Sequence, residues 1–512
     1  MSGDYTHKSA KNMIVSLGVQ IVVLLLGFFS RYIFIHVLSA EYLGINGLFT
    51  NVLTLLSFTE LGIGEALVFA MYKPMKEGNE SKLKALLHFY KKAYTWIAIA
   101  VLAIGFIISF FVDGFVNEKP NISENFQVIF VLFLLNNVTS YIMVYKQSLL
   151  MVDQSKYLVS LVQQAVKIGQ MCFQILLLYF THSYYAYLIL QIVGTLMTNF
   201  VLSVYVNKHY PLASQKGICR LDKEEKSAIF QDIKALSISK IAGIVSNGAD
   251  NIVIARLINL TSVGLVSNYT MVTGTVNGLI WNTLSSITGS IGQFNVDSSI
   301  ERKRTVFDEL FLLTFWIYSF VTIGLVTMLS PLVTIWLGSD YVIETSVVVA
   351  LVSIIYVNGL NFPFYSFRVT CGLFEPLKYN YVIFALSNIA VSIVLGIKFG
   401  LTGIYAATVI TRLLTTEFKE GIVVYTRILN KRKALYFLKY FGFAALHIAT
   451  FAVTKTVVEL IPMDGWAGWI VKCIACSIFV NLLYAFAFFR TKAFRGLVQK
   501  GRKLVKRSPR AC

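Results

Sequence analysis

Apolar runs long enough to cross a lipid bilayer recur along the whole of this 512-residue chain. Residues 14–30, 126–144 and 311–329, for example, contain no charge, and each approaches or reaches the ~20 residues with which a helix spans a hydrocarbon core of about 30 Å. Charged residues make up 14% of the chain, against about 25% in a typical soluble domain. A helix satisfies its own backbone hydrogen bonds in lipid. The sequence therefore predicts an all-α polytopic membrane protein.

Fourteen transmembrane helices are expected when apolar runs are marked between polar or proline-containing breaks. Their ranges are 13–38, 45–70, 92–112, 126–148, 156–180, 184–206, 237–258, 263–294, 306–330, 341–367, 379–399, 400–425, 435–457 and 466–489. Seven of the eight prolines, Pro74 and Pro331 among them, lie outside these ranges, as expected where helices must stop. Only Pro363 lies inside one.

Lys and Arg alternate between the two sides of this predicted topology. The connections that follow odd-numbered spans carry almost none, whereas clusters lie within residues 73–92, 208–226, 302–304, 427–433 and 490–510. Basic loops remain in the cytoplasm during insertion, so both termini are expected there. Much of the net charge of +19 then comes from basic residues of the cytoplasmic loops and tail, which are expected to contact the membrane surface. The basic runs lack interleaved stacking aromatics, so nucleic-acid binding is not expected.

An internal repeat is suggested by an offset of 220 residues. This offset superimposes residues 43–45 (Leu-Gly-Ile) on 263–265 (Val-Gly-Leu), and Ser30-Arg31 on Asp250-Asn251. Transporters are often built from repeated helix bundles. We therefore predict two six-helix bundles plus two C-terminal helices. The predicted parts are an N-lobe (1–207), a cytoplasmic linker (208–236), a C-lobe (237–430), a helix pair (431–489) and a basic cytoplasmic tail (490–512).

Ionisable residues within the apolar spans are candidates for function, because a charge near the bilayer centre costs about 2.5–3.5 kcal/mol even on the lenient scale. Such a side chain usually faces a cavity or a partner. The candidates are Arg31, Glu60, Glu65, Lys167, Asp250, Arg256, Arg368, Arg412 and Glu417. Arg256 and Arg368 lie near predicted helix ends, where we interpret them as side chains that extend to the interface.

A polar stripe marks the span 156–180, where Gln163, Lys167, Gln170 and Gln174 share one helical face. A polar seam between packed helices would give the same spacing, but a lysine in mid-span favours a water-filled cavity. Asn247 and Asp250 similarly lie near one face of the span 237–258. For Asp250, a structural ion pair with an arginine and a role in transport fit the pattern equally well.

Pro363 follows Asn358, Gly359 and Asn361 within the span 341–367. Proline removes a backbone hydrogen bond and clashes with the preceding turn, so a kink is expected here. A hinge and a purely structural kink are equally compatible with this pattern.

Motifs for catalysis, ATP hydrolysis and metal binding are not found in the sequence. There is no GxxxxGK[ST], HExxH or GxSxG, so neither a catalytic residue nor ATP-driven pumping is expected. Cys473 and Cys476 form a CxxC, but they lie in an apolar run where helix packing is the better interpretation. No metal site and no bound cofactor are expected.

The residues that carry a family resemblance lie near the start of the chain. Lys11-Asn12 and Arg31, the run Leu43-Gly44-Ile45-Asn46-Gly47-Leu48, and Glu60-Leu61-Gly62-Ile63-Gly64 resemble polysaccharide-repeat-unit flippases of the Wzx type, in the MOP exporter superfamily. The resemblance implies two six-helix bundles in a MATE-like V shape and transport by alternating access. It also implies translocation of undecaprenyl-diphosphate-linked oligosaccharide from the cytoplasmic to the outer leaflet of the bacterial inner membrane. Coupling to H⁺ or Na⁺, and partners such as a polymerase and other polysaccharide-assembly proteins, are implied in the same way.

Site residues can be assigned on this reading, because a diphosphate bearing sugars needs cations and hydrogen-bonding side chains. The expected substrate contacts are Arg31, Lys167, Arg412, Gln163, Gln170 and Asn247. Glu60 and Asp250 are candidates to bind the coupling ion, or simply to balance the nearby cations. Asn251 stands in the repeat where Arg31 stands in the first half, so a symmetric arginine pair is not expected.

Other functions remain open at this point. A flippase for the peptidoglycan precursor lipid II is hard to separate from the repeat-unit flippase, whereas a multidrug exporter fits a cationic cavity poorly. A membrane enzyme of lipid-linked glycan assembly is an alternative of another class. Such an enzyme should show a carboxylate pair on the first outer loop, where Glu41 stands alone.

Overall fold

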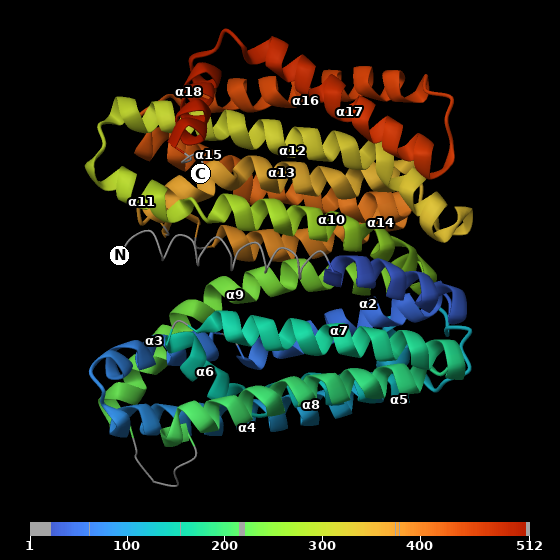
Figure 1. The fold of residues 1–512 in the computed structure, drawn as a ribbon, viewed down its shortest axis with the longest axis vertical. Coiled ribbons are helices and arrows are strands. Elements are labelled where there is room, and N and C mark those ends of the chain that lie inside the picture. The colour runs from blue at the N-terminus through green and yellow to red at the C-terminus, as the bar shows by residue number, and fades with distance from the viewer. Residues whose placement is uncertain are drawn as a thin grey trace, which may run out of the picture. The chain divides into compact units, whose positions relative to one another are not determined.

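The computed structural model describes residues 22–60, 62–153, 155–213, 221–373, 375–377 and 379–507. Every regular element in these ranges is a helix, as Figure 1 shows. The prediction of an all-α protein is thus confirmed. Contacts within the chain define two compact units, Met1–Gly264 (unit 1) and Leu265–Cys512 (unit 2). The five-part division drawn from the sequence stays a prediction.

Unit 1 is built from long helices, some of them broken. Its helices are Val22–Val37, α2 (Ala40–Leu56), η1 (Ser57–Glu60), α3 (Ile63–Lys76), α4 (Glu80–Ser109), α5 (Phe126–Tyr141), α6 (Val144–Val152), α7 (Lys156–Thr181), α8 (Tyr184–His209) and α9 (Lys223–Leu257), with 3-10 turns at Val112–Phe115 and Pro211–Ala213. Side chains mark several starts: Asn79 accepts a hydrogen bond from the Lys82 amide, and Asn125 from the Val128 amide. These caps satisfy amides that the helix leaves free.

Sharp bends occur at two places in unit 1, one between the expected spans 13–38 and 45–70 and one inside the expected span 126–148. The helix Val22–Val37 meets α2 at 119°, and α5 meets α6 at 44°. A further break separates α2 from α3, where Gly62 adopts a φ of 70°. Glycine takes this left-handed conformation without a Cβ clash, so the expected span 45–70 is two helices rather than one.

Unit 2 packs around an aromatic core. Its helices are α10 (Leu260–Ser285, from Leu265 on), α11 (Thr288–Asp297), α12 (Ile300–Leu337), α13 (Thr345–Thr370), α14 (Asn380–Arg412), α15 (Phe418–Val423), α16 (Lys433–Glu459), α17 (Gly465–Phe488) and α18 (Lys492–Arg507), with 3-10 turns at Ser339–Tyr341 and Glu375–Leu377. Phe307, Phe311, Phe364 and Tyr425 are buried in contact with one another. This core holds α12 and α13 against the segment after α15.

Breaks in unit 2 occur at Gly400 and around α15. Gly400 has a φ of 58° inside α14, at the boundary between the expected spans 379–399 and 400–425. Two π-helical segments, Leu413–Glu417 and Val424–Ile428, flank the short α15. The chain after Gly400 is therefore helical but wound irregularly.

Eight helices in the described residues are long and apolar enough to cross a membrane, or up to ten if each bent pair is one span. The chain is thus a multi-pass membrane protein, while the count of fourteen stays a prediction. The expectation for the prolines was partly wrong, because Pro74 lies inside α3 and Pro331 inside α12. Both lie within the last two turns of their helices, so each removes one i to i−4 hydrogen bond near a helix end.

Candidate functional site

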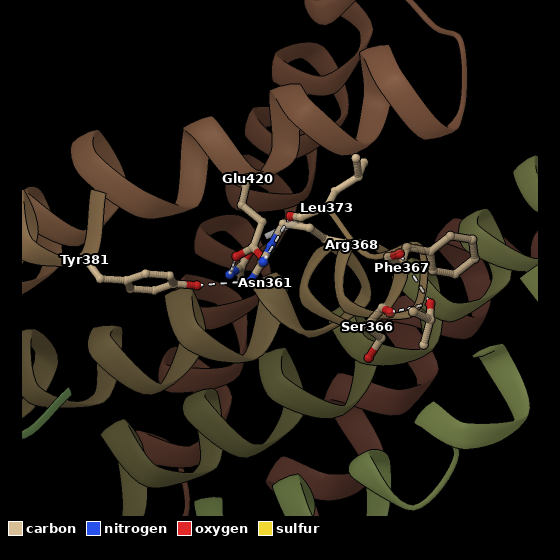
Figure 2. A network of polar contacts seen from close by, with 8 residues as sticks. Asn361, Ser366, Phe367, Arg368, Leu373, Tyr381 and Glu420 are labelled. Carbon is tan, nitrogen blue, oxygen red and sulfur yellow. Dashed lines mark hydrogen bonds and ion pairs between the residues drawn. The ribbon is translucent and has the colours of Figure 1, made fainter. Parts of the chain in front are cut away.

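A buried ion pair joins α13 to α15 in unit 2. Arg368 donates through Nε to Oε1 of Glu420, and the two side chains are only 4% and 1% exposed. The second carboxylate oxygen of Glu420 accepts from Nδ2 of Asn361 at 2.6 Å. Nη2 of Arg368 donates to the Tyr381 hydroxyl at 3.1 Å, and Nη1 to the Leu373 carbonyl oxygen at 3.3 Å. Figure 2 shows these groups converging on the guanidinium.

The interpretation of Arg368 as a side chain that reaches the interface was therefore wrong. Its position near the end of α13 suggested an exposed guanidinium, but Glu420 lies across from it and makes burial favourable. Glu420 was not singled out from the sequence. The criterion used there, an ionisable side chain within an apolar span, would have included it.

A second arginine, Arg412, lies at the end of α14 in the same unit. Its Nη1 donates to Oδ1 of Asn358 in α13, and its guanidinium carbon lies 4.9 Å from the centre of the Phe384 ring. Its Nε has no hydrogen-bond partner among the described residues. Arg412 is half-buried. A cation held by one amide and one aromatic face can still bind an anion.

Arg31 is half-buried in the helix Val22–Val37 of unit 1, beside Tyr187 of α8 with which it interacts electrostatically. Lys167 lies on α7 of the same unit and is exposed. The predicted cationic contacts are therefore divided between the units, with Arg31 and Lys167 in unit 1 and Arg412 in unit 2.

The polar stripe on α7 has two different halves. Gln163 and Lys167 are exposed, whereas Gln174 is 3% exposed and donates to the Tyr187 carbonyl oxygen at 3.1 Å. Gln170 donates to Gln174 at 3.4 Å and packs so closely on Gly194 of α8 that a Cβ there would clash with it. The half with Gln170 and Gln174 is thus a packed seam between α7 and α8.

Glu60 lies at the break between α2 and α3, facing hydroxyl groups of neighbouring helices. The hydroxyl of Tyr94 in α4 donates to Oε1 of Glu60 at 2.8 Å. Tyr141 of α5 donates to Oγ of Ser57 at 3.3 Å and also lies near Glu60. An added Cβ at Gly64 would lie 2.5 Å from the Tyr94 hydroxyl. The Glu60 carboxylate therefore faces phenolic hydroxyl groups.

Asp250 is half-buried on α9, and the next residue, Asn251, donates to the Gly47 carbonyl oxygen of α2 at 3.5 Å. The side chain of Asn247 lies outside the described residues. Arg256 is exposed at the end of α9 and donates to the Val116 carbonyl oxygen at 3.0 Å. Its position at the end of α9 is confirmed, while its extension to the membrane interface stays a prediction.

Gly44 and Gly264 are the two glycines that the 220-residue offset superimposes, and they make equivalent contacts. A Cβ on Gly44 would clash with the Leu260 carbonyl oxygen, and a Cβ on Gly264 with the Ala40 carbonyl oxygen. Ala40 and Leu260 are themselves related by the same offset. The start of α2 thus crosses the start of α10 backbone against backbone, through contacts that are themselves related by the 220-residue offset.

Pro363 is buried in α13, which runs without interruption from Thr345 to Thr370. Gly359, four residues earlier, packs against the ring of Tyr318 in α12. Whether Pro363 acts as a hinge stays a prediction.

Polar residues at the bend between α5 and α6 were also missed from the sequence. Lys146 donates to Oγ of Ser203 at 2.8 Å, and Gln147 donates to Oδ1 of Asn199 at 2.9 Å. Asn199 in turn donates to the Thr139 carbonyl oxygen at 3.1 Å. Near the bend, Asn199 thus satisfies the backbone carbonyl oxygen of Thr139.

A cavity of about 300 Å³ in unit 2 lies between α10, α12 and α17. Val272, Leu325, Met328, Trp469 and Cys473 are among its lining residues. This lining suits a hydrocarbon rather than a sugar or a phosphate. Among the residues that the structure describes, no group of three or more His, Cys, Asp or Glu side chains is placed to hold a metal ion.

Comparison with known proteins places the chain in a family. Residues 9–288, more than half of the chain, match the family described as polysaccharide biosynthesis protein. No curated protein gives a significant sequence match.

Solved structures share the fold at low sequence identity. An inward closed structure of the lipid II flippase MurJ aligns with a TM-score of 0.67 at 14% identity, over 93% of this chain and 99% of that chain. An inward-facing multidrug resistance MATE family transporter of the MOP superfamily aligns with a TM-score of 0.58 at 12% identity, over 77% and 91%. A MOP superfamily transporter from Pyrococcus furiosus aligns with a TM-score of 0.51 at 13% identity, over 82% and 95%. The chain therefore belongs to the polysaccharide biosynthesis protein family and has the fold of the transporters of the MOP superfamily.

Proposed function

We propose that this protein is a flippase that moves undecaprenyl-diphosphate-linked oligosaccharide repeat units from the cytoplasmic to the outer leaflet of the bacterial inner membrane. The observation that carries this proposal is the match of residues 9–288 to a family of polysaccharide biosynthesis proteins, in a chain whose fold is that of flippases and transporters. Transport would proceed by alternating access coupled to H⁺ or Na⁺. A polymerase and other assembly proteins would receive the product.

Cationic side chains within the helices support an anionic headgroup as substrate. Arg31, Lys167 and Arg412 would contact the diphosphate or acidic sugars, since charge-assisted hydrogen bonds to phosphate are stronger than neutral ones. Gln163 would contribute hydrogen bonds from the exposed half of the α7 stripe. Gln170 is engaged in the seam with α8, so we assign it a packing role instead.

The experiment is a leaflet-transfer assay on the full-length protein reconstituted in vesicles with a fluorescent lipid-linked oligosaccharide. Hydrogen bonds to charged groups contribute about 1.5–3 kcal/mol, so we expect Arg31→Ala or Lys167→Ala to slow transfer by about tenfold or more. Lys119→Ala is the matched control, because it removes a cation that is 82% exposed in the loop before α5. Equal rates of transfer in all three variants would refute the proposed contacts of Arg31 and Lys167 with the substrate. If the wild type transfers no lipid under any ion gradient, the proposed flippase function is refuted.

The second candidate is a flippase for lipid II, favoured by the likeness to MurJ over 93% of the chain. Both substrates carry a polyprenyl diphosphate, so the sugars decide between them. Competition in the same vesicles separates the two: unlabelled lipid II should inhibit transfer strongly only if it is the better substrate.

A further inference from the structure

Glu417 is a buried carboxylate that the proposed substrate contacts do not use. The residue is 4% exposed, and its Oε2 atom has no hydrogen-bond partner among the described residues. It lies in the π-helical segment Leu413–Glu417, whose i to i+5 hydrogen bond joins the Phe418 amide to the Leu413 carbonyl oxygen. Segments of π-helix inside α-helices frequently mark functional sites.

Glu420, three residues further on, provides the contrast. Its two oxygens are bound by Arg368 and Asn361, so it is locked as the anion of an ion pair. Glu417 has no such donors at Oε2, and burial then favours the neutral acid, because a buried charge without hydrogen bonds is costly. Of these two neighbouring carboxylates, Glu417 is the one with an oxygen that accepts no hydrogen bond from the described residues.

The ionisable groups that face Glu417 come from three helical segments. Arg412 attracts it from the end of α14, and Glu420 repels it from α15. Tyr381 of α14 and Tyr436 and Tyr440 of α16 interact with it electrostatically. Tyr436 also donates to the backbone carbonyl oxygen of Glu417 at 3.4 Å. Arg412 is thus the nearby cation whose charge Glu417 can balance.

A proton fits this site better than a metal ion. Metal cations such as Ca²⁺ and Mg²⁺ require about six oxygen ligands, and the guanidinium of Arg412 would repel a second cation. We propose that Glu417 is a proton-binding site, and that its protonation removes a negative charge that otherwise offsets the attraction of Arg412 for an anionic diphosphate. A proton from water adds to the carboxylate to give the neutral acid, while Arg412 keeps its charge. The coupling of proton binding at Glu417 to transport rests on the proposed function.

Reciprocity follows from this arrangement. If protonation of Glu417 strengthens anion binding at Arg412, then anion binding must strengthen proton binding at Glu417 by the same factor. Protonation and substrate binding would then strengthen one another, so the affinity of unit 2 for its substrate would depend on pH.

The first experiment measures the proton itself. Infrared difference spectra of the full-length protein in nanodiscs are recorded between about pH 8 and about pH 6, both above the range of exposed carboxyl groups near 4. We expect a carbonyl band of a protonated acid that Glu417→Gln abolishes and Glu417→Asp shifts. Glu344→Gln, at an exposed carboxylate before α13, should leave the band unchanged. A band that persists in Glu417→Gln overturns the proposal.

The second experiment measures binding of undecaprenyl diphosphate as the probe, at the same two pH values. Since the probe also titrates, each variant is compared with wild type at the same pH. We expect Glu417→Gln to bind as tightly as wild type at the lower pH and more tightly at the higher pH, and Arg412→Ala to bind weakly at both. If Glu417→Gln and wild type differ at neither pH, the link to Arg412 is refuted. A wild type that shows the infrared band but no leaflet transfer would refute the proposed function alone.

Discussion

At the scale of single residues, the surroundings of each buried charge determine how it is tolerated. Arg368 and Glu420 form a pair in which Asn361, Tyr381 and the Leu373 carbonyl oxygen satisfy further hydrogen-bonding groups. Such a pair stabilises only when both partners are present, because removing one leaves an uncompensated buried charge. It therefore acts as a structural link between α13 and α15.

This reasoning predicts the outcome of a double-mutant cycle. Arg368→Ala should lower the free energy of unfolding by about 3–5 kcal/mol, as should Glu420→Ala, because each leaves one charge buried alone. The double variant Arg368→Ala/Glu420→Ala should lose clearly less than the sum of the two single losses. Unfolding of the purified protein in denaturing detergent is the measurement. A double variant whose loss equals the sum of the single losses would contradict the pairing.

At the scale of helices, close backbone contacts and helix starts decide the arrangement of unit 1. The crossing of α2 with the start of α10 depends on Gly44 and Gly264, where neither backbone leaves room for a Cβ. Small residues allow such close approach in membrane proteins. The start of α9, in contrast, is polar. Asp222 is its N-cap residue, and the side chains of Asp222 and Glu225 form a capping box there.

Adding one methyl group at the crossing should destabilise the fold. We expect Gly44→Ala and Gly264→Ala each to cost about 1–3 kcal/mol through overpacking, seen as a lower thermal midpoint. Gly274→Ala in α10 is the matched control, since nothing lies within 4 Å of its added Cβ. Alanine there should gain up to about 1 kcal/mol, as in an ordinary helix. Equal shifts in all three variants would disprove the close crossing.

The contribution of the Lys82–Glu225 pair at the start of α9 to the stability of the protein should depend on pH. A hydrogen bond from Lys82 of α4, with Nζ 2.5 Å from Oε1, lowers the pKa of Glu225 below its usual 4.5. Because the pKa of this acid is depressed on folding, its contribution to stability is present above 4.5 and is lost as pH falls through the lower folded value. The gap in thermal midpoint between wild type and Glu225→Gln should therefore be constant above about pH 5.5 and shrink below 4.5. A gap that does not change with pH would refute the pairing.

At the scale of the whole molecule, the alternation of basic loops makes a prediction about orientation. With only Cys512 retained from the six cysteines, an impermeant thiol reagent should label inside-out vesicles and not right-side-out ones, because basic tails stay in the cytoplasm. A cysteine introduced in place of Lys119, in the loop between α4 and α5, should show the opposite pattern. Labelling of both sites from the same side would overturn the predicted topology.

The helical class and the break at residue 400 could be read from the sequence, because both follow from local properties: apolar length, and a glycine between two apolar runs. The bends at Gly62 and Met143 were missed. Each is a single residue in the left-handed region, and neither interrupts the apolar pattern from which spans are marked.

Candidate site residues were harder to judge, since their roles depend on neighbours remote in sequence. The stripe of glutamines on α7 was correctly placed on one helix face, but only the structure shows that Gln170 and Gln174 pack in a seam with α8. Spacing along a helix reveals which side chains share a face. It does not reveal what that face contacts.

The sequence by itself determined that this protein is helical and lies in lipid, because hydrophobicity and internal hydrogen bonding are properties of each segment alone. It also pointed to the family through motifs in the first seventy residues. Only the tertiary structure decided that Arg368 is paired and that Oε2 of Glu417 lacks a hydrogen-bond partner. The physical reason is that the cost of a buried charge depends on donors and acceptors brought in by other helices.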